Sequence, residues 1–177
     1  MRLLIKHGAD VTARDVHRMT PLHMASSWVS GEYAALHTVR TDFSGQNGAT
    51  GKWYMEASTD KANTVQLLIL HGADVTARDD THSTPLHLAS SKRSAESVDI
   101  LIQHGSDVNA KDANQSTPLH LAASSRLKLE GTIVRLLLKR GAKVDAKDSE
   151  GRTPFDVASA EGNSWIAKLL SDHCAAK

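Results

Sequence analysis

The sequence predicts an all-α solenoid with short β-hairpins or turns, built from a repeated unit that holds two short helices. The first observation is a Thr-Pro-Leu-His motif at residues 20–23, 84–87 and 117–120, with Thr-Pro-Phe-Asp at 153–156. The second is a recurring glycine, at Gly8, Gly72, Gly105 and Gly141. Both landmarks are separated by steps of 64, 33 and 36 residues. Because two independent landmarks keep one irregular spacing, we infer a stack of units of about 33 residues.

The motif explains where the first helix of each unit begins. Threonine before a helix can cap it, and proline at the first helical position needs no donor and has its φ preset. A second apolar pattern, seen at Val98, Leu101 and Ile102, ends at His104-Gly105, where glycine can take the left-handed conformation. The polar stretch 76–83 then predicts a projecting turn or hairpin.

The whole chain, residues 1–177, is predicted to be one array. Its parts are a partial repeat (1–14), a repeat interrupted by an insertion at about 29–59 (15–78), two further repeats (79–111 and 112–147) and a C-terminal capping repeat (148–177). Met1 falls inside a second helix, so we expect a fragment of a longer array or a misassigned start codon. Leu4 and Ile5 should then be half covered, and this end should fray.

The long step between the first two motifs has three interpretations. Deleting residues 29–59 aligns the flanking sequences with 89–98 without gaps, which favours one insertion between two helices of a repeat. A decayed repeat, with a helix from Glu32 to Thr41, is the first alternative, although the segment has no Thr-Pro motif. Translated intron sequence beginning at Val29-Ser30 is the second. A smaller insertion is expected around residues 126–129.

These motifs resemble the ankyrin repeat, most clearly over residues 112–147 with Thr117-Pro118-Leu119-His120 and the glycine at Gly141. The resemblance implies antiparallel helix pairs in a curved solenoid with hairpins projecting from one edge. It also implies that His87 and His120 tie neighbouring hairpins together by hydrogen bonds. Family hairpins usually carry glycine two residues before the motif. Here that position holds Arg18, His82 and Gln115, with glycine only at Gly151, so the first three turns are expected to be looser or differently shaped.

Composition narrows the class of partner and the compartment. The 21 basic and 20 acidic residues are interspersed, so no basic block indicates nucleic acid or a membrane surface. The single cysteine, Cys174, allows no internal disulfide and suits the cytoplasm or the nucleus. No apolar run approaches the length of a signal peptide or a membrane-spanning helix. We expect a soluble monomer.

The sequence offers little support for catalysis, a cofactor or a metal. Residues 45–52 resemble a phosphate-binding loop, but Gln46 replaces its first glycine and Trp53 its Ser or Thr. Six of the ten histidines belong to the repeat motifs or helix ends, and none has metal-ligand spacing. No serine has a nucleophile-elbow context, and Cys174 lies in a tail. We therefore expect no catalytic residues, no cofactor and no metal.

The predicted function is non-catalytic binding of another protein, of unspecified identity, on the concave face that hairpins and first helices form in such arrays. The candidate contact residues are Val16, His17, Met19, Trp28, Asp80, Thr81, Ser83, Ser91, Lys92, Ala113, Asn114, Ser116, Ser125, Ser149, Glu150 and Arg152. Trp28 and Met19 are the sharpest candidates, because large apolar side chains on an exposed face can anchor a partner. The alternatives are a recruiting fragment of a larger enzyme or adaptor, or a non-functional fragment of a longer array.

Overall fold

A computed structural model describes residues 10–27, 39–40, 52–53, 61–92, 94–124 and 131–175 of the chain. The helices are α2 (Pro21–Ser27), α3 (Lys61–Leu70), α4 (Pro85–Ser91), α5 (Ala95–Gln103), α6 (Pro118–Ala123), α7 (Gly131–Lys139), α8 (Pro154–Ala160) and α9 (Ser164–Ala175). The strands are β1 (Val39–Arg40) and β2 (Lys52–Trp53).

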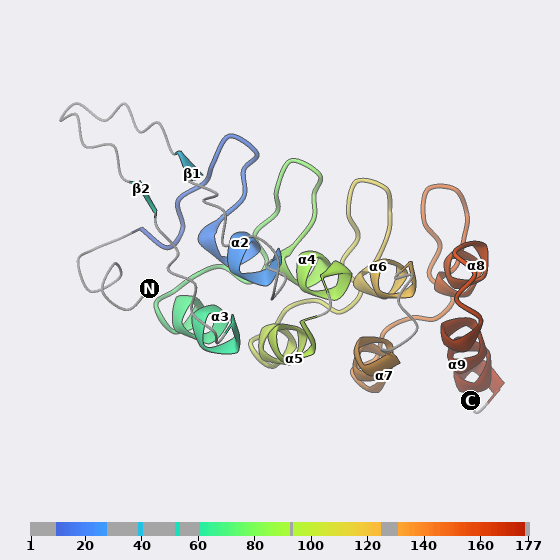
Figure 1. The fold of residues 1–177 in the computed structure, drawn as a ribbon. Helices are drawn as coiled ribbons and strands as arrows, with labels where there is room; N and C mark the ends of the chain where they lie inside the picture. Colours follow the sequence, from blue (N-terminus) through green and yellow to red (C-terminus); the bar gives the residue numbers. More distant parts are fainter. Residues whose placement is uncertain are drawn as a thin grey trace.

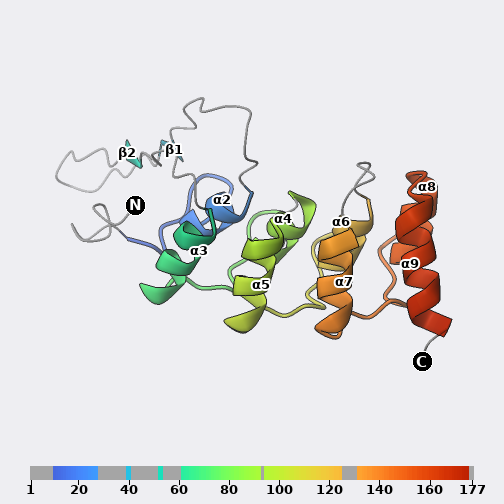
Figure 2. The ribbon, with the colours of Figure 1, turned by 60° about the horizontal axis from the view of Figure 1, so that its bottom comes forward.

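The helices pack as pairs that stand side by side in a row. Helices α2, α4, α6 and α8 form one layer, each in contact with the next, and α3, α5, α7 and α9 form a second layer (Figures 1 and 2). The turns project from the side of the first layer that faces away from the second (Figure 1). The predicted all-α repeat solenoid is therefore confirmed.

The first helices begin as the motif predicts. Thr84 and Thr117 have extended backbones, with φ of −96° and −97°, and proline follows each as the first helical residue. The same arrangement begins α8, where the Thr153 hydroxyl accepts a hydrogen bond from the amide of Asp156. Proline contributes no amide hydrogen there, so the unpaired end of the helix loses nothing.

The second helices end at glycines in the left-handed conformation. Gly72, Gly105 and Gly141 have φ of 89°, 92° and 88°. At the end of α5 the amide of Gly105 donates to the carbonyl of Ile102, and the amide of Ser106 donates to that of Leu101. These two hydrogen bonds satisfy carbonyl groups that would otherwise lack a partner at the end of the helix. Gly8 lies outside the described residues.

The core is a continuous apolar spine that runs through the stack. Its fully buried members occupy equivalent positions: Leu22, Leu86 and Leu119 in the first helices, and Val65, Val98, Leu68, Leu101, Leu137 and Leu170 in the second. The last pair differs, because Phe155 stands where the other first helices carry leucine and is 43% exposed.

Helix α2 packs against α3 although 33 residues separate them, just as α4 packs against α5. This packing is the one that an insertion between two helices of one repeat requires, and the exact boundaries stay a prediction. Within the separating segment, Val39 pairs with Trp53 and Arg40 with Lys52 in an antiparallel bridge. The helix from residue 32 to 41 suggested for the decayed-repeat alternative therefore does not include Val39 and Arg40. The expectations for residues 1–9 and 126–129 fall outside the described residues.

Candidate protein-binding face

Each projecting turn is held by the aspartate that opens it. In the second turn, Asp79 Oδ1 accepts hydrogen bonds from the amides of Thr81 and Ser83 at 2.8 and 2.9 Å. The Asp79 amide donates to the Ser83 carbonyl, and the His82 amide donates to the Asp79 carbonyl. Asp15, Asp112 and Asp148 make the same bonds in the other three turns. Four turns of different sequence thus share one backbone shape.

The expectation that missing glycines change the turn shape is wrong. Arg18, His82 and Gln115 adopt the left-handed conformation, with φ of 58°, 58° and 57°, beside 76° for Gly151. Most L residues avoid this region because Cβ crowds the carbonyl that follows, at a cost of about 1–2 kcal/mol. The hydrogen bonds of the opening aspartate outweigh that cost, so the turn keeps its shape.

The turns are joined to one another by backbone hydrogen bonds. The Asp80 amide donates to the His17 carbonyl at 3.0 Å, and the Ala113 amide donates to the Thr81 carbonyl at 2.9 Å. The last contact, from the Ser149 amide to the Asn114 carbonyl, is 2.8 Å long. Each turn is therefore fixed in relation to the next, and the tips form one row along the solenoid (Figure 1).

A buried histidine below each of the first three turns links consecutive repeats. Nδ1 of His87 lies 3.1 Å from the amide nitrogen and 2.8 Å from the hydroxyl of Thr84, and its Nε2 lies 3.1 Å from the carbonyl of Ser116. A carbonyl can only accept, so Nε2 carries the proton and Nδ1 accepts from Thr84. His23 and His120 make the same contacts, reaching the carbonyls of Ser83 and Arg152.

Burial keeps these histidines neutral. Desolvation lowers the pKa of His23, His87 and His120, and the hydrogen bond from each ring to a carbonyl opposes that shift only in part. The neutral form is the one the geometry needs, since a protonated Nδ1 would point a hydrogen at the threonine amide. The role that the ankyrin resemblance implies for His87 and His120 is confirmed, and His23 shares it.

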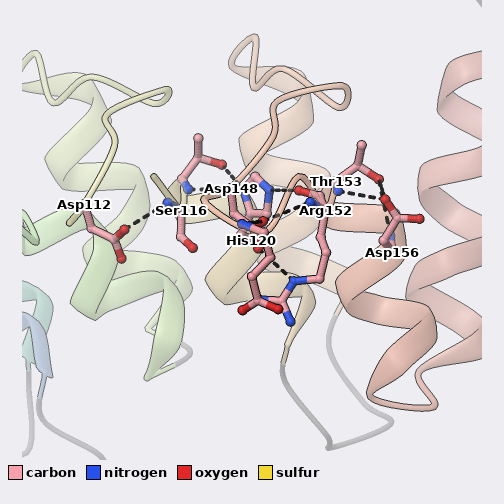
Figure 3. A network of polar contacts seen from close by, with 9 residues as sticks. Asp112, Ser116, His120, Asp148, Arg152, Thr153 and Asp156 are labelled. Atoms are coloured by element: carbon pink, nitrogen blue, oxygen red, sulfur yellow. Dashed lines mark hydrogen bonds and ion pairs between the residues drawn. The ribbon is translucent and has the colours of Figure 1, made fainter. Parts of the chain in front are cut away.

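The series of links ends at the fourth motif (Figure 3). His120 reaches the Arg152 carbonyl, and Arg152 Nε in turn donates to Asp148 at 2.9 Å. Asp156, which replaces histidine, accepts from the Thr153 amide and hydroxyl at 2.8 and 2.7 Å. It caps α8 as histidine caps the other first helices, but a carboxylate has no donor for the carbonyl of a further repeat.

Basic side chains form a second series of hydrogen bonds between neighbouring turns. The Arg14 guanidinium donates to the Arg78 carbonyl at 3.0 Å, and the Arg78 guanidinium donates to the Lys111 carbonyl at 2.6 Å. The Lys111 ammonium donates to the Lys147 carbonyl at 3.1 Å. The sequence shows no basic stripe because these residues are spread over the chain, and only stacking aligns them.

Most of the predicted contact residues are exposed on this face. The exposed ones are Val16, His17, Asp80, Thr81, Ser91, Lys92, Ala113, Asn114, Ser149, Glu150 and Arg152. Met19 and Ser116 are half-buried. Trp28 and Ser125 lie outside the described residues. Val16, a large apolar side chain of this face, is 82% exposed.

Ser83 was expected on the exposed face, and this placement is wrong. The residue is only 7% exposed, its amide is bound by Asp79, and its Oγ lies 3.0 Å from the hydroxyl of Thr81. Conversely, Arg18, His82 and Gln115 were not among the candidates, yet all three are exposed at the turns. Their occurrence at a glycine position was the signal that could have identified them.

Among the described residues, no group of three or more His, Cys, Asp or Glu could hold a metal ion. Cys174 is exposed. No helix in the described ranges is long and apolar enough to cross a membrane.

The fold is that of a helical repeat protein, because it has paired helices, projecting turns and the same helix cap in successive repeats. A family model described as "Ankyrin repeats (3 copies)" matches residues 54–148 and 113–177, which is more than half of the chain. The chain belongs to the ankyrin repeat family. No curated protein matched the sequence.

Proposed function

We propose that this chain binds another protein on the face formed by the projecting turns and the adjacent ends of α2, α4 and α6. Ankyrin repeats are generally protein–protein interaction modules and typically non-catalytic. The proposal adds the face and the residues to that general role. The chain has a single cysteine, which suits a reducing compartment, so we place the protein in the cytoplasm or the nucleus. We also expect it to be a monomer.

The proposal rests on the different roles of the buried and the exposed residues within each turn. Aspartates such as Asp79 and Asp112 are buried and hold the backbone, whereas the next two residues of each turn are exposed. Those exposed residues differ from turn to turn, from Val16-His17 to Asp80-Thr81, Ala113-Asn114 and Ser149-Glu150. A rigid frame with varied tips loses little entropy on docking and can select its partner by side chain.

The test compares two variants of equal added charge in affinity capture from a lysate of the source organism. The tip variant carries Val16→Arg, Ala113→Arg and Ser149→Arg. The matched control carries Gln66→Arg, Thr132→Arg and Ser171→Arg, all exposed positions of the second helices. We expect the tip variant to lose proteins that wild type and control both retain. Equal retention by both variants would reject this face as the binding surface.

A further inference from the structure

Three of the four turns carry a side chain at the position where the fourth turn carries glycine. Arg18, His82 and Gln115 hold φ near 58° on the surface of the protein, where Gly151 holds the same conformation without a side chain. Each could be glycine at a lower conformational cost. Local backbone strain that the fold does not require is a feature of functional sites.

The side chains at these three positions are available to a ligand. Within the described part of the chain, the Arg18 guanidinium and the His82 imidazole make no hydrogen bond or ion pair. Gln115 uses only its Oε1, which lies 3.4 Å from the Lys111 ammonium, so its amide hydrogens stay available. Three successive turns therefore present unused donors.

A row of cations lies directly beside them. Arg14, Arg78 and Lys111 stand four residues before the strained positions, and all three are exposed. The two rows are adjacent, since the Arg78 guanidinium donates to the His82 carbonyl at 2.8 Å. Each cation binds carbonyls of its own or the next turn, and none is in ion-pair contact with a carboxylate in the described residues. The aspartates of the turns direct Oδ1 at backbone amides, as Asp79 does.

We propose that this donor row, defined as Arg14, Arg18, Arg78, His82, Lys111 and Gln115, binds an extended acidic peptide segment of the partner protein. The proposal rests on the proposed function and adds the chemistry of the ligand. Equivalent residues of stacked repeats lie about 8–10 Å apart, the distance between packed helices. A polyproline II segment advances about 3.1 Å per residue with three residues per turn, so every third side chain falls on one face about 9 Å from the last. A carboxylate at every third residue would meet one turn each.

The same surface is poorly suited to a nucleic acid. Asp80 and Glu150 are exposed at the turn tips. A nucleic-acid strand carries a charge about every 3.4 Å along its axis, so its phosphates would also lie against these carboxylates. A peptide whose charges are spaced by a repeat can avoid them.

The test measures binding of a fluorescein-labelled peptide of about twelve residues with the sequence Glu-Pro-Pro repeated, which favours the polyproline II conformation. Fluorescence anisotropy titrations would use the full chain. Three comparison probes are a Gln-Pro-Pro repeat, a peptide of the same composition with adjacent glutamates, and an oligothymidylate. We expect the Glu-Pro-Pro peptide to bind at least about tenfold more tightly than the other three, and to weaken as ionic strength rises from about 0.05 to 0.5 M.

The decisive variant is R18G/H82G/Q115G, because it removes the side chains and relieves the strain. We expect at least a tenfold loss of peptide affinity with an unchanged or higher melting temperature. The control K139Q/K168Q removes two cations from the second helices and should bind as wild type does.

Unchanged affinity in the glycine variant, or an equal loss in the control, would overturn the proposal. Equal binding of the glutamine or adjacent-glutamate peptide would also overturn it, and tighter binding of the oligothymidylate would assign the row to nucleic acid instead. A lysate partner lost in the tip variant but no binding of the peptide would reject the acidic-peptide ligand while leaving the proposed function intact.

Discussion

The Nε2–H of His87 donates to the carbonyl oxygen of Ser116 over 3.1 Å, across the boundary between two repeats. The same ring accepts at Nδ1 from the amide and hydroxyl of Thr84. One buried side chain thus caps its own helix and fixes the next turn, so helix formation and stacking depend on each other.

The two tasks of His87 can be separated by substitution. His87→Ala should lower the free energy of unfolding by about 2–4 kcal/mol, because it creates a cavity and leaves buried polar groups without partners. His87→Asn can still accept from Thr84 but does not reach Ser116, so it should lose about half as much. Urea denaturation measures both. The control His104→Ala removes an exposed ring and should cost less than about 0.5 kcal/mol. Equal losses for all three variants would contradict the double role.

Stability should fall as pH decreases from about 7 toward 5. Burial lowers the folded-state pKa of His23, His87 and His120 below the ordinary value of 6.5. The unfolded chain then binds more protons, so stability is full above that value and is lost as pH falls through it toward the folded pKa. Urea midpoints at several pH values measure this loss. His120→Gln should reduce the slope and His71→Gln, an exposed control, should leave it unchanged.

Protonation of Asp74 and Asp156 would not cause a loss of stability between pH 7 and pH 5. The pKa values of Asp74 and Asp156 are lowered from 3.8, chiefly by hydrogen bonds from Thr76 and Thr153. Their stabilisation is present above 3.8 and is lost only below it. A stability loss confined to pH below 4 would therefore contradict the prediction for the histidines.

Replacing the strained turn residues with glycine should stabilise the fold. His82→Gly and Gln115→Gly remove a left-handed cost of about 1–2 kcal/mol and add an unfolded-state entropy cost of about 0.5–1, so each should gain about 0.5–1 kcal/mol. Gly151→Ala introduces the strain and should lose a similar amount. Thermal melts of the three single variants provide the measurement. Destabilisation by the two glycines would show that their side chains contribute to folding.

A buried hydroxyl in α4 offers a fourth test. Ser90 Oγ is buried and has no hydrogen-bond partner among the described residues, whereas the equivalent Ser26 Oγ donates to the Leu22 carbonyl at 2.7 Å. The third repeat has Ala123 at this position. Ser90→Ala should raise the free energy of unfolding by about 1 kcal/mol, since an unpaired buried polar group is removed. Ser26→Ala, the matched control, should gain nothing. The same gain in both would attribute the effect to helix propensity alone.

Sequence reasoning predicted the repeat and the helix starts and ends from local chemistry, and the ankyrin resemblance implied that His87 and His120 link neighbouring hairpins. Proline after threonine suits the first turn of a helix such as α4, and the left-handed Gly105 suits the end of one such as α5. The same reasoning failed at Ser83, because a polar stretch does not reveal which of its side chains becomes buried in the folded turn. It also failed at His82, where it expected a looser turn and the hydrogen bonds of Asp79 impose the standard one.

The sequence by itself determined the unit and its order, because both follow from residues close together in the chain. Only the tertiary structure decided which contacts the units make with one another. Arg14 and Arg78 are 64 residues apart, yet stacking brings the guanidinium of one to the carbonyl of the other. Alignment of the donor row and burial of the linking histidines both arise from that stacking, since each depends on contacts between units rather than within them.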